Sequence, residues 1–265
     1  MNAPQIQVRN VHKVFPTGGA EVVALKGIDL EIHQGEFVCL LGPSGCGKST
    51  LLNAVAGFSL PTTGEILVDG QAVAAPGPER GMVFQEYALF PWMTVEANIA
   101  FGLQIKKRPK AEIRETVDGL LGMLHLREFR NRYPKDLSGG MRQRVAIARV
   151  LALDSQILLM DEPFGALDAL TRRNLQDELL RVWIELKKTI LFVTHSLEES
   201  IYLADRIVLM TYRPGTLKRD VTVTMPRPRD VSSLEFNALK KELGSLLMEE
   251  QNRHAEAEFT GTAVD

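Results

Sequence analysis

The chain has 265 residues, of which 45% are hydrophobic and 24% charged, with a formal net charge of -2. This balance is typical of a globular protein and excludes a global basic field that recruits nucleic acid. There is no run of eighteen apolar residues, and the N-terminus lacks a secretory signal, so we expect no membrane span and no export. The 2 cysteines do not make a disulfide framework, which favours a reducing compartment.

The first third of the chain is predicted to be rich in β-strands. Residues 6–14 and 22–32 are predicted strands, separated by a Pro16-Thr17-Gly18-Gly19 turn. A further strand at 65–68 ends in Asp69-Gly70, a dipeptide typical of a tight hairpin turn.

A glycine-rich segment within this region predicts a phosphate-binding loop. It follows the apolar run 37–41, precedes a helical pattern and fits Gly-x-x-x-x-Gly-Lys-[Ser/Thr]. Glycines let backbone N–H groups turn toward phosphate oxygens, Lys48 reaches the β/γ-phosphates, and Ser49 offers its hydroxyl to Mg²⁺. A chance match arises in roughly one chain of this length in a hundred. The residues predicted to bind nucleotide are Gly42, Pro43, Ser44, Gly45, Cys46, Gly47, Lys48, Ser49 and Thr50.

The rest of the chain changes from helices to alternating strands and helices. Apolar residues recur at helical spacing over 113–124 and again over 175–186. Continuous apolar runs at 157–160, 190–193 and 207–210 predict strands that are covered on both faces of a parallel sheet. Beyond the prolines near residue 226 we expect a helical tail, and we expect the last dozen residues to be disordered.

Two acids end the apolar run at 157–160. A buried strand would deliver Asp161 at its carboxyl end, where a carboxylate can hold the shell of a Mg²⁺ ion. Glu162 follows and could polarise a water for attack on a γ-phosphate. The alternative is an acidic strand end that faces solvent, which the phosphate-binding loop makes the weaker interpretation.

A second glycine-containing segment spans residues 137–144. Ser138 can cap a helix that runs through Leu151, and Gly139 and Gly140 leave the N-terminus of that helix open to an anion. An ordinary loop and cap would have the same local chemistry, so this segment alone does not decide between the two.

Together these segments resemble the ATPase subunit of an ATP-binding cassette (ABC) transporter, over roughly residues 5–230. Residues 137–143 resemble the family's signature motif, and 165–168 resemble its D-loop. The further residues that match functional positions of the family are Phe15 (adenine stacking, where Tyr or Trp are frequent), Gln85 (Q-loop), Ser138, Gly139, Gly140 and Gln143 (signature motif), Asp168 (D-loop) and His195 (switch histidine).

The resemblance implies an α/β fold: a P-loop NTPase (RecA-like) parallel sheet core with an antiparallel β subdomain and an inserted helical subdomain. Residues 1–230 would form one ATP-binding domain with the helical insertion at roughly 86–155, and 231–265 a tail. The ligands would be ATP and Mg²⁺. Catalysis would use Glu162, His195 and Gln85, and the metal would be held by Ser49, Gln85 and Asp161.

The resemblance also implies partners. Two copies would associate head to tail, with ATP between the phosphate-binding loop of one and the signature motif of the other. Residues 89–95, 98–103 and 226–230 are similar to the nitrate/sulfonate/taurine-type importers. Such a subunit would lie in the cytoplasm on the inner face of the membrane, bound to transmembrane permease subunits and indirectly to a solute-binding protein, without nucleic acid.

Three alternatives stay open at this stage. Phe90 and Trp92 could line a docking groove for a permease helix, or they could fill the core of the helical lobe. The chain could also belong to an exporter or a lipid-trafficking system. A DNA- or ribosome-acting ABC ATPase is disfavoured, since the chain has one cassette and no sustained heptads between Lys48 and Ser138. The transported solute is not encoded in this chain.

Overall fold

The computed structural model describes residues 3–17 and 20–259, which form two compact units. The first unit consists of two segments, one up to Pro76 and one from Thr189 onward, and the second unit runs from Gly77 to Lys188. The predicted α/β class, with parallel strands, an antiparallel sheet and helices, is confirmed. Helices α2, α3 and α4, which fall in the expected helical insertion, all belong to the second unit.

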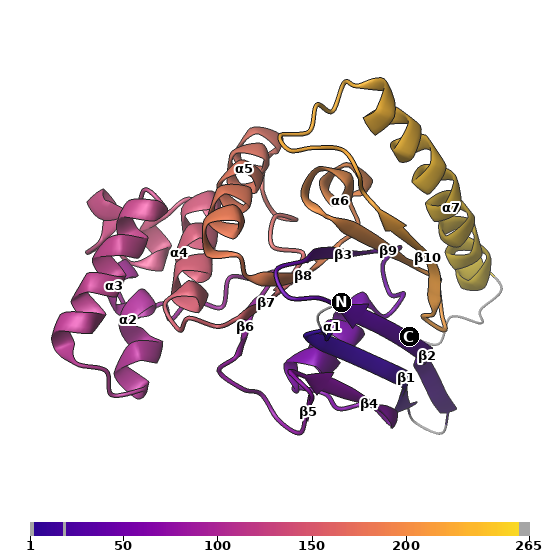
Figure 1. The fold of residues 1–265 in the computed structure, drawn as a ribbon, viewed down its shortest axis with the longest axis horizontal. Coiled ribbons are helices and arrows are strands. Elements are labelled where there is room, and N and C mark those ends of the chain that lie inside the picture. Colours follow the sequence, from indigo (N-terminus) through magenta and orange to yellow (C-terminus); the bar gives the residue numbers. More distant parts are fainter. Residues whose placement is uncertain (1–2, 18–19, 260–265) are drawn as a thin grey trace. The chain divides into compact units, whose positions relative to one another are not determined.

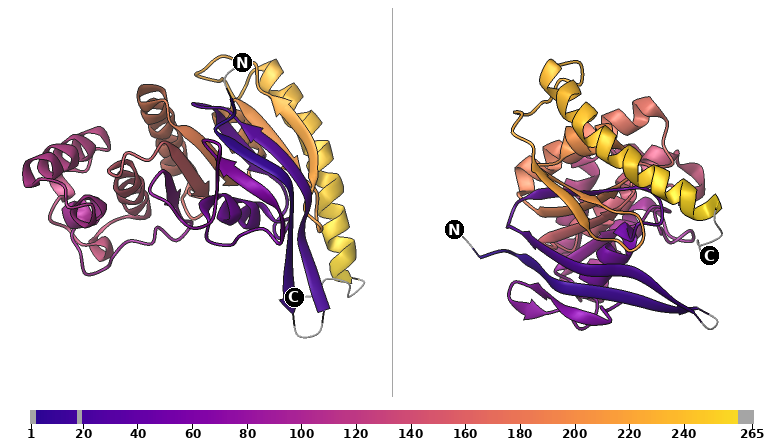
Figure 2. Two further views of the ribbon diagram at one scale, coloured as in Figure 1. Left: turned by 60° about the horizontal axis from the view of Figure 1, so that its bottom comes forward. Right: turned by 90° about the vertical axis from the view of Figure 1, so that its right-hand side faces the viewer.

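The antiparallel sheet of the first unit has the strand order β2-β1-β4-β5. A long hairpin dominates it, in which Ile6 pairs with Ile32 and Phe15 with Val22 (Figure 2). Both predicted strands of this hairpin are present and extend further than expected, while residues 18–19 of the predicted turn lie outside the described part. The strands are β1 (Ile6–Thr17), β2 (Ala20–Ile32), β4 (Thr63–Val68) and β5 (Gln71–Ala72).

The turn between β4 and β5 confirms the prediction made from Asp69-Gly70. Both residues have positive φ, 48° at Asp69 and 74° at Gly70. Two consecutive residues with positive φ define the type I′ turn, whose twist matches that of the flanking strands.

The second sheet of the first unit has the strand order β10-β9-β3-β8. β3 pairs in parallel with β8 and with β9, and every residue of β3 and β8 is buried. This confirms the interpretation of the continuous apolar runs. The antiparallel edge strand β10 has a polar sequence that did not suggest a strand. The bounds are β3 (Phe37–Leu41), β8 (Thr189–Thr194), β9 (Arg206–Met210) and β10 (Leu217–Thr222).

The first unit also contains the helices α1 (Lys48–Ala56), α6 (Leu197–Leu203) and α7 (Leu234–Phe259). α7 packs on α6 and runs alongside β10 (Figure 1). Since α7 continues to Phe259, the expectation of disorder in the last dozen residues is wrong for the part before residue 260. Residues 260–265 lie outside the described part of the chain.

The second unit pairs β6 (Arg80–Val83) in parallel with β7 (Ile157–Asp161). Its helices pack on one another, α2 against α3 and α4, and α4 against α5 and β6. They are α2 (Val95–Ile105), α3 (Lys110–Met123), α4 (Gly139–Leu151) and α5 (Ala169–Leu186), with the short 3₁₀ turns Arg127–Phe129 and Pro134–Asp136.

Among the described residues, none of the helices combines the length and the apolar character needed to cross a membrane.

Candidate functional site

The phosphate-binding loop lies at the carboxyl edge of the parallel strands in the first unit. It connects the end of β3 to the start of α1. Leu41, the last residue of β3, pairs in register with Thr194 of β8 on one side and Leu209 of β9 on the other. The loop is therefore flanked by His195, which follows β8, and by the segment that follows β9. Ligands of parallel sheets bind at this edge.

Two glycines of the loop have backbone conformations that side chains disfavour. Gly45 has a φ of 72° and Gly47 a φ of 97°. A Cβ atom at Gly47 would lie 2.8 Å from Leu25 Cδ2 and 2.9 Å from the Ala24 carbonyl oxygen. Gly47 is also the N-cap of α1, so the loop turns directly into the positive end of that helix.

Lys48 points into the loop. Its side chain is buried, with only 4% of the residue exposed. Its Nζ donates hydrogen bonds to the carbonyl oxygens of Gly42 at 2.9 Å and Pro43 at 2.8 Å. A cation held within a turn of backbone N–H groups is the arrangement that binds phosphate.

Cys46 is a buried neighbour of this lysine and not a reactive thiol. Its Sγ lies 3.8 Å from Lys48 Nζ. Burial raises the pKa of the Cys46 thiol, and this outweighs the lowering effect of Lys48. Ser44 and Gly45 are exposed at the tip of the loop, whereas Ser49 and Thr50 are half-buried.

His195 is exposed and held at the end of β8 by its neighbours. Thr194 Oγ1 donates to Glu199 Oε2 at 2.5 Å and accepts from the backbone N–H of Ser196 at 2.9 Å. Ser196 caps α6 by accepting from the Glu199 N–H. The histidine therefore lies on a tight strand-to-helix turn next to the phosphate-binding loop. Phe15 lies on the β1–β2 hairpin and is 38% exposed, with Lys13 Nζ 5.1 Å from its ring centre.

The second unit brings Gln85, Glu162 and Gly165 together. Val83 of β6 pairs in register with Met160 of β7, so the residues that follow the two strands share one edge. A Cβ atom at Gly165 would lie 3.8 Å from both Gln85 Nε2 and Glu162 Oε2. Asp161 and Glu162 are half-buried. Glu162 has a φ of 42°, a conformation that costs free energy in a residue other than glycine and often occurs at functional sites.

The signature motif and the D-loop are also in contact within this unit. Ser138 is exposed and caps α4, accepting a hydrogen bond from the Met141 N–H at 3.3 Å. A Cβ atom at Gly139 would lie 3.1 Å from Leu167 Cδ2, and one at Gly140 would lie 2.6 Å from Thr171 Cγ2. The glycines thus allow the start of α4 to lie close to the segment that leads into α5.

Asp168 has the same capping role at the next helix. Its carboxylate accepts a hydrogen bond from the Thr171 N–H at 2.9 Å at the start of α5. Hydrogen bonding by Thr171 lowers the pKa of Asp168, so this exposed carboxylate stays ionised near neutral pH.

Gln143 does not share the exposed surface of Ser138. It is fully buried on α4, and within the described structure neither of its amide atoms has a hydrogen-bond partner. The helical turn carries its side chain inward, so the geometry gives no support to the expectation that Gln143 binds nucleotide.

The Pro-Arg-Pro-Arg segment has a structural role that its sequence did not reveal. Arg229 is buried, and burial, followed by the repulsion from Arg227, lowers its pKa to about 10. Its guanidinium donates to five backbone carbonyl oxygens, those of Met225, Ile201, Tyr202, Ala204 and Val223.

The two aromatic residues after Gln85 differ in their surroundings. Trp92 is 71% exposed and is not a core residue. Phe90 is half-buried, with its ring centre 4.5 Å from that of Phe101 and 5.5 Å from the guanidinium of Arg149. The interpretation that both fill the core is therefore wrong for Trp92.

Comparisons with known proteins identify the family of this chain. The family model described as "ABC transporter" matches residues 25–165. The nitrate import ATP-binding protein of Synechocystis sp. is 46% identical over 89% of this chain and 89% of its own length. The aliphatic sulfonates import ATP-binding protein of Bacillus cereus is 44% identical over 90% and 94%.

A solved structure is similar as well. It is a dimeric ATP-binding cassette in a post-hydrolysis state, bound to ADP and phosphate, with a TM-score of 0.74 and 34% identity. The match covers 83% of this chain and all of the solved chain (100%). The chain therefore belongs to the ABC transporter family, as an ATP-binding subunit that hydrolyses ATP.

Proposed function

We propose that this chain is the ATP-hydrolysing subunit of an importer that takes up a small solute of the nitrate, sulfonate or taurine class through a separate permease. The named relatives that support this are import proteins, for nitrate and for aliphatic sulfonates. No observation favours the exporter or lipid-trafficking alternative. The subunit would lie on the inner face of the cell membrane as a peripheral protein, which is the location expected from the sequence.

The buried Lys48 is the observation that carries the nucleotide-binding part of this proposal. The carbonyl oxygens of Gly42 and Pro43 hold its ammonium group inside the turn. The β- and γ-phosphates of ATP would replace or join these carbonyls as partners of Lys48. These bonds keep the lysine in the loop, where the phosphates would bind.

Three residues are proposed to act on the γ-phosphate. Glu162 would accept the proton of the attacking water, since it is a half-buried carboxylate beside Gln85. Gln85 would orient that water, and His195 would contact the γ-phosphate from its turn after β8.

The residues proposed for Mg²⁺ have suitable donor chemistry. Ser49 and Asp161 offer a hydroxyl and a carboxylate, and Gln85 offers an amide oxygen, all of which Mg²⁺ accepts as ligands. The described residues contain no group of three or more His, Cys, Asp or Glu that could hold a metal ion. Mg²⁺ usually keeps waters and binds through one or two carboxylates and the substrate phosphates. Bound there, the ion would neutralise charge on the β- and γ-oxygens.

A second copy of the chain is proposed to complete the site. Ser138 and Asp168 both cap helices and remain exposed, so their surfaces can receive another subunit. The similar solved cassette is a dimer with ADP and phosphate bound. In the proposed head-to-tail pair, the start of α4 would face the γ-phosphate held by the partner.

The exposed Trp92 is proposed to contact the permease.

ATP binding and phosphate release test this function directly. The purified chain should be stabilised by ATP against thermal unfolding and should release phosphate when Mg²⁺ is present. Lys48→Ala should be stabilised much less at the same ATP concentration and should release little phosphate. Lys241→Ala removes an exposed lysine of α7 in the same unit and is the matched control. Equal responses from the two variants would contradict the proposal.

A further inference from the structure

A short segment between β9 and β10, residues 211–216, lies against the phosphate-binding loop. Its Gly215 donates to the Ala24 carbonyl oxygen at 3.0 Å and accepts from the Lys26 N–H at 3.0 Å. A Cβ atom at Gly215 would overlap the carbonyl oxygen of Cys46. The segment is thus fixed to β2 and in close contact with the backbone of the loop.

Arg213 makes a direct bond to this loop. Its Nε donates to the carbonyl oxygen of Gly45 at 3.3 Å. Gly45 lies at the exposed tip with positive φ, and without a side chain its backbone has more conformational freedom than that of other residues. A hydrogen bond from a charged donor at this point restricts the part of the loop that is intrinsically most free to change.

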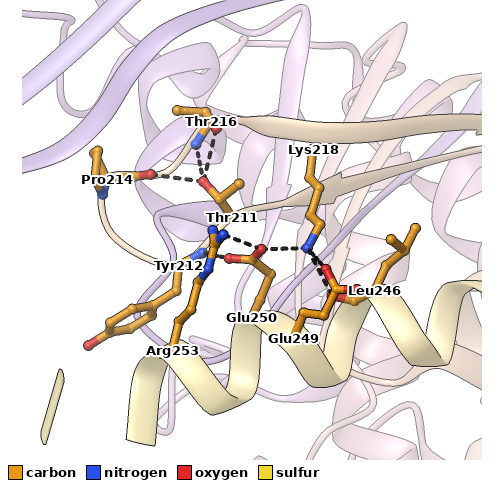
Figure 3. Close-up of polar contacts among 9 residues, drawn as sticks. All are labelled: Thr211, Tyr212, Pro214, Thr216, Lys218, Leu246, Glu249, Glu250 and Arg253. Carbon is orange, nitrogen blue, oxygen red and sulfur yellow. Dashed lines mark hydrogen bonds and ion pairs between the residues drawn. The ribbon is translucent and has the colours of Figure 1, made fainter. Parts of the chain in front are cut away.

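The preceding residue is held by α7. The Tyr212 N–H donates to Glu250 Oε2 at 2.9 Å, and its ring packs edge-on against that of His254 at 4.5 Å (Figure 3 shows the polar contacts). Glu250 has a fully buried side chain, which also accepts from Lys218 Nζ at 2.6 Å and from Arg253 Nη1 at 3.3 Å. This cluster fixes the peptide of Tyr212 to the helix.

The segment is also closed on itself. Thr211 Oγ1 donates to the Pro214 carbonyl oxygen at 2.9 Å and accepts from the Thr216 N–H at 2.9 Å (Figure 3). Tyr212 and Arg213 are consecutive, so a shift of the peptide held by Glu250 moves the guanidinium that holds Gly45. The geometry gives a continuous connection from α7 to the phosphate-binding loop.

We propose that Arg213 is a positioning residue for the bound nucleotide, and that α7 sets its effect through the bond between Glu250 and Tyr212. The proposal rests on the proposed binding of nucleotide by the loop. By restraining Gly45, the bond lowers the ordering cost that binding of the phosphates would otherwise carry. It acts on affinity and not on the chemical step.

Equilibrium binding of ADP to the full chain, followed by calorimetry, tests the proposal together with kcat and KM for ATP. Arg213→Ala should weaken ADP binding about three- to tenfold, as expected for one hydrogen bond, with kcat nearly unchanged. Arg213→Lys, which keeps a cationic donor, should recover most of the affinity. Glu250→Gln should weaken binding in the same direction, and the double variant should be no weaker than Arg213→Ala alone, because both act through one segment.

Arg219→Ala is the matched control. Arg219 is an exposed arginine of β10 that pairs with Glu242 of α7 at 3.6 Å, so it also links the helix to the sheet. It should leave ADP affinity at the wild-type value. Thermal melts of all variants separate binding effects from loss of fold.

Several results would overturn the inference. These are wild-type affinity in Arg213→Ala, a lowered melting temperature without a change in affinity, or fully additive effects of the Arg213 and Glu250 changes. A wild-type chain that fails to bind ADP would instead overturn the proposed function itself.

Discussion

One buried residue of the first unit and three exposed residues of the second unit have opposite surroundings. In the first unit the key cation, Lys48, is buried and bonded to loop carbonyls, and the loop around it is in close contact with β2 and with residues 211–216. In the second unit Gln85, Ser138 and Asp168 are exposed. A buried, restrained site suits tight binding of one ligand. The exposed helix caps Ser138 and Asp168 and the exposed amide of Gln85 suit contacts with another protein subunit. The difference suits the proposal that the first unit binds the nucleotide and that the exposed residues of the second unit contact another subunit.

The largest change is expected in ATP turnover, on substitution of a residue of the second unit. Glu162→Gln keeps the side-chain shape and removes the base, so ATP turnover should fall by about 10²–10⁴-fold. The affinity for ATP should change little, because the phosphate-binding loop and Lys48, which are proposed to bind the nucleotide, lie in the first unit. Phosphate release and equilibrium binding measured on the same preparation check this, and turnover near the wild-type rate would exclude Glu162 as the base.

Lys48→Ala should show the converse pattern. Removing the cation should weaken nucleotide binding by roughly ten- to a hundredfold, the value of one or two charge-assisted hydrogen bonds. The free energy of unfolding without nucleotide should change much less. Calorimetric binding and chemical denaturation separate the two quantities, and an unchanged ATP affinity would contradict the assigned role.

The segments that carry these two proposed roles could be recognised from sequence because their signals are local. The spacing of Gly42, Gly47 and Lys48 and the apolar run before Asp161 lie within short segments, and continuous apolar runs correctly gave strands β3, β7, β8 and β9. What the sequence did not reveal depends on distant partners. The structural roles of Arg213 and Arg229 were not recognised, since each side chain contacts carbonyl oxygens from distant parts of the chain.

The sequence also did not show to which side of a helix each side chain points. Gln143 lies close in sequence to Ser138 and was grouped with it, yet α4 turns it into the core. The exposed and buried faces of α4 could be separated only once its neighbours α2 and α5 were placed.

The attachment of α7 in the first unit should depend on pH. Burial opposes ionisation of Glu250, but hydrogen bonds from Lys218 and from the Tyr212 N–H prevail and lower its pKa below 4.5. The unfolded chain then binds the proton more readily, so the stabilisation is present above about pH 4.5 and is lost as the pH falls through the lower, folded value.

Glu250→Gln should therefore cost roughly 1–2 kcal/mol of stability at pH 7. The difference from wild type should shrink toward pH 3. Denaturant unfolding at several pH values measures both, with Glu242→Gln, an exposed acid of α7, as the control. A pH-independent difference would refute the role of ionised Glu250.

The smallest effect on stability is expected at Trp92 in the second unit. Because this side chain is 71% exposed, Trp92→Ala should change the free energy of unfolding by about 0.5 kcal/mol or less. Phe90→Ala, which removes packing on Phe101, should cost more, roughly 1–3 kcal/mol. Co-purification with the permease should fail for Trp92→Ala. Severe destabilisation by Trp92→Ala would contradict the proposed docking role.

We propose that the nucleotide site of one subunit is completed by the exposed surface of a second. Sedimentation of Glu162→Gln with and without ATP tests it most directly, since this variant should bind ATP but not consume it. We expect a monomer without nucleotide and a dimer with ATP, and no dimer when Ser138→Arg is added at the proposed contact. A Glu162→Gln chain that binds ATP and remains a monomer at all concentrations would contradict it.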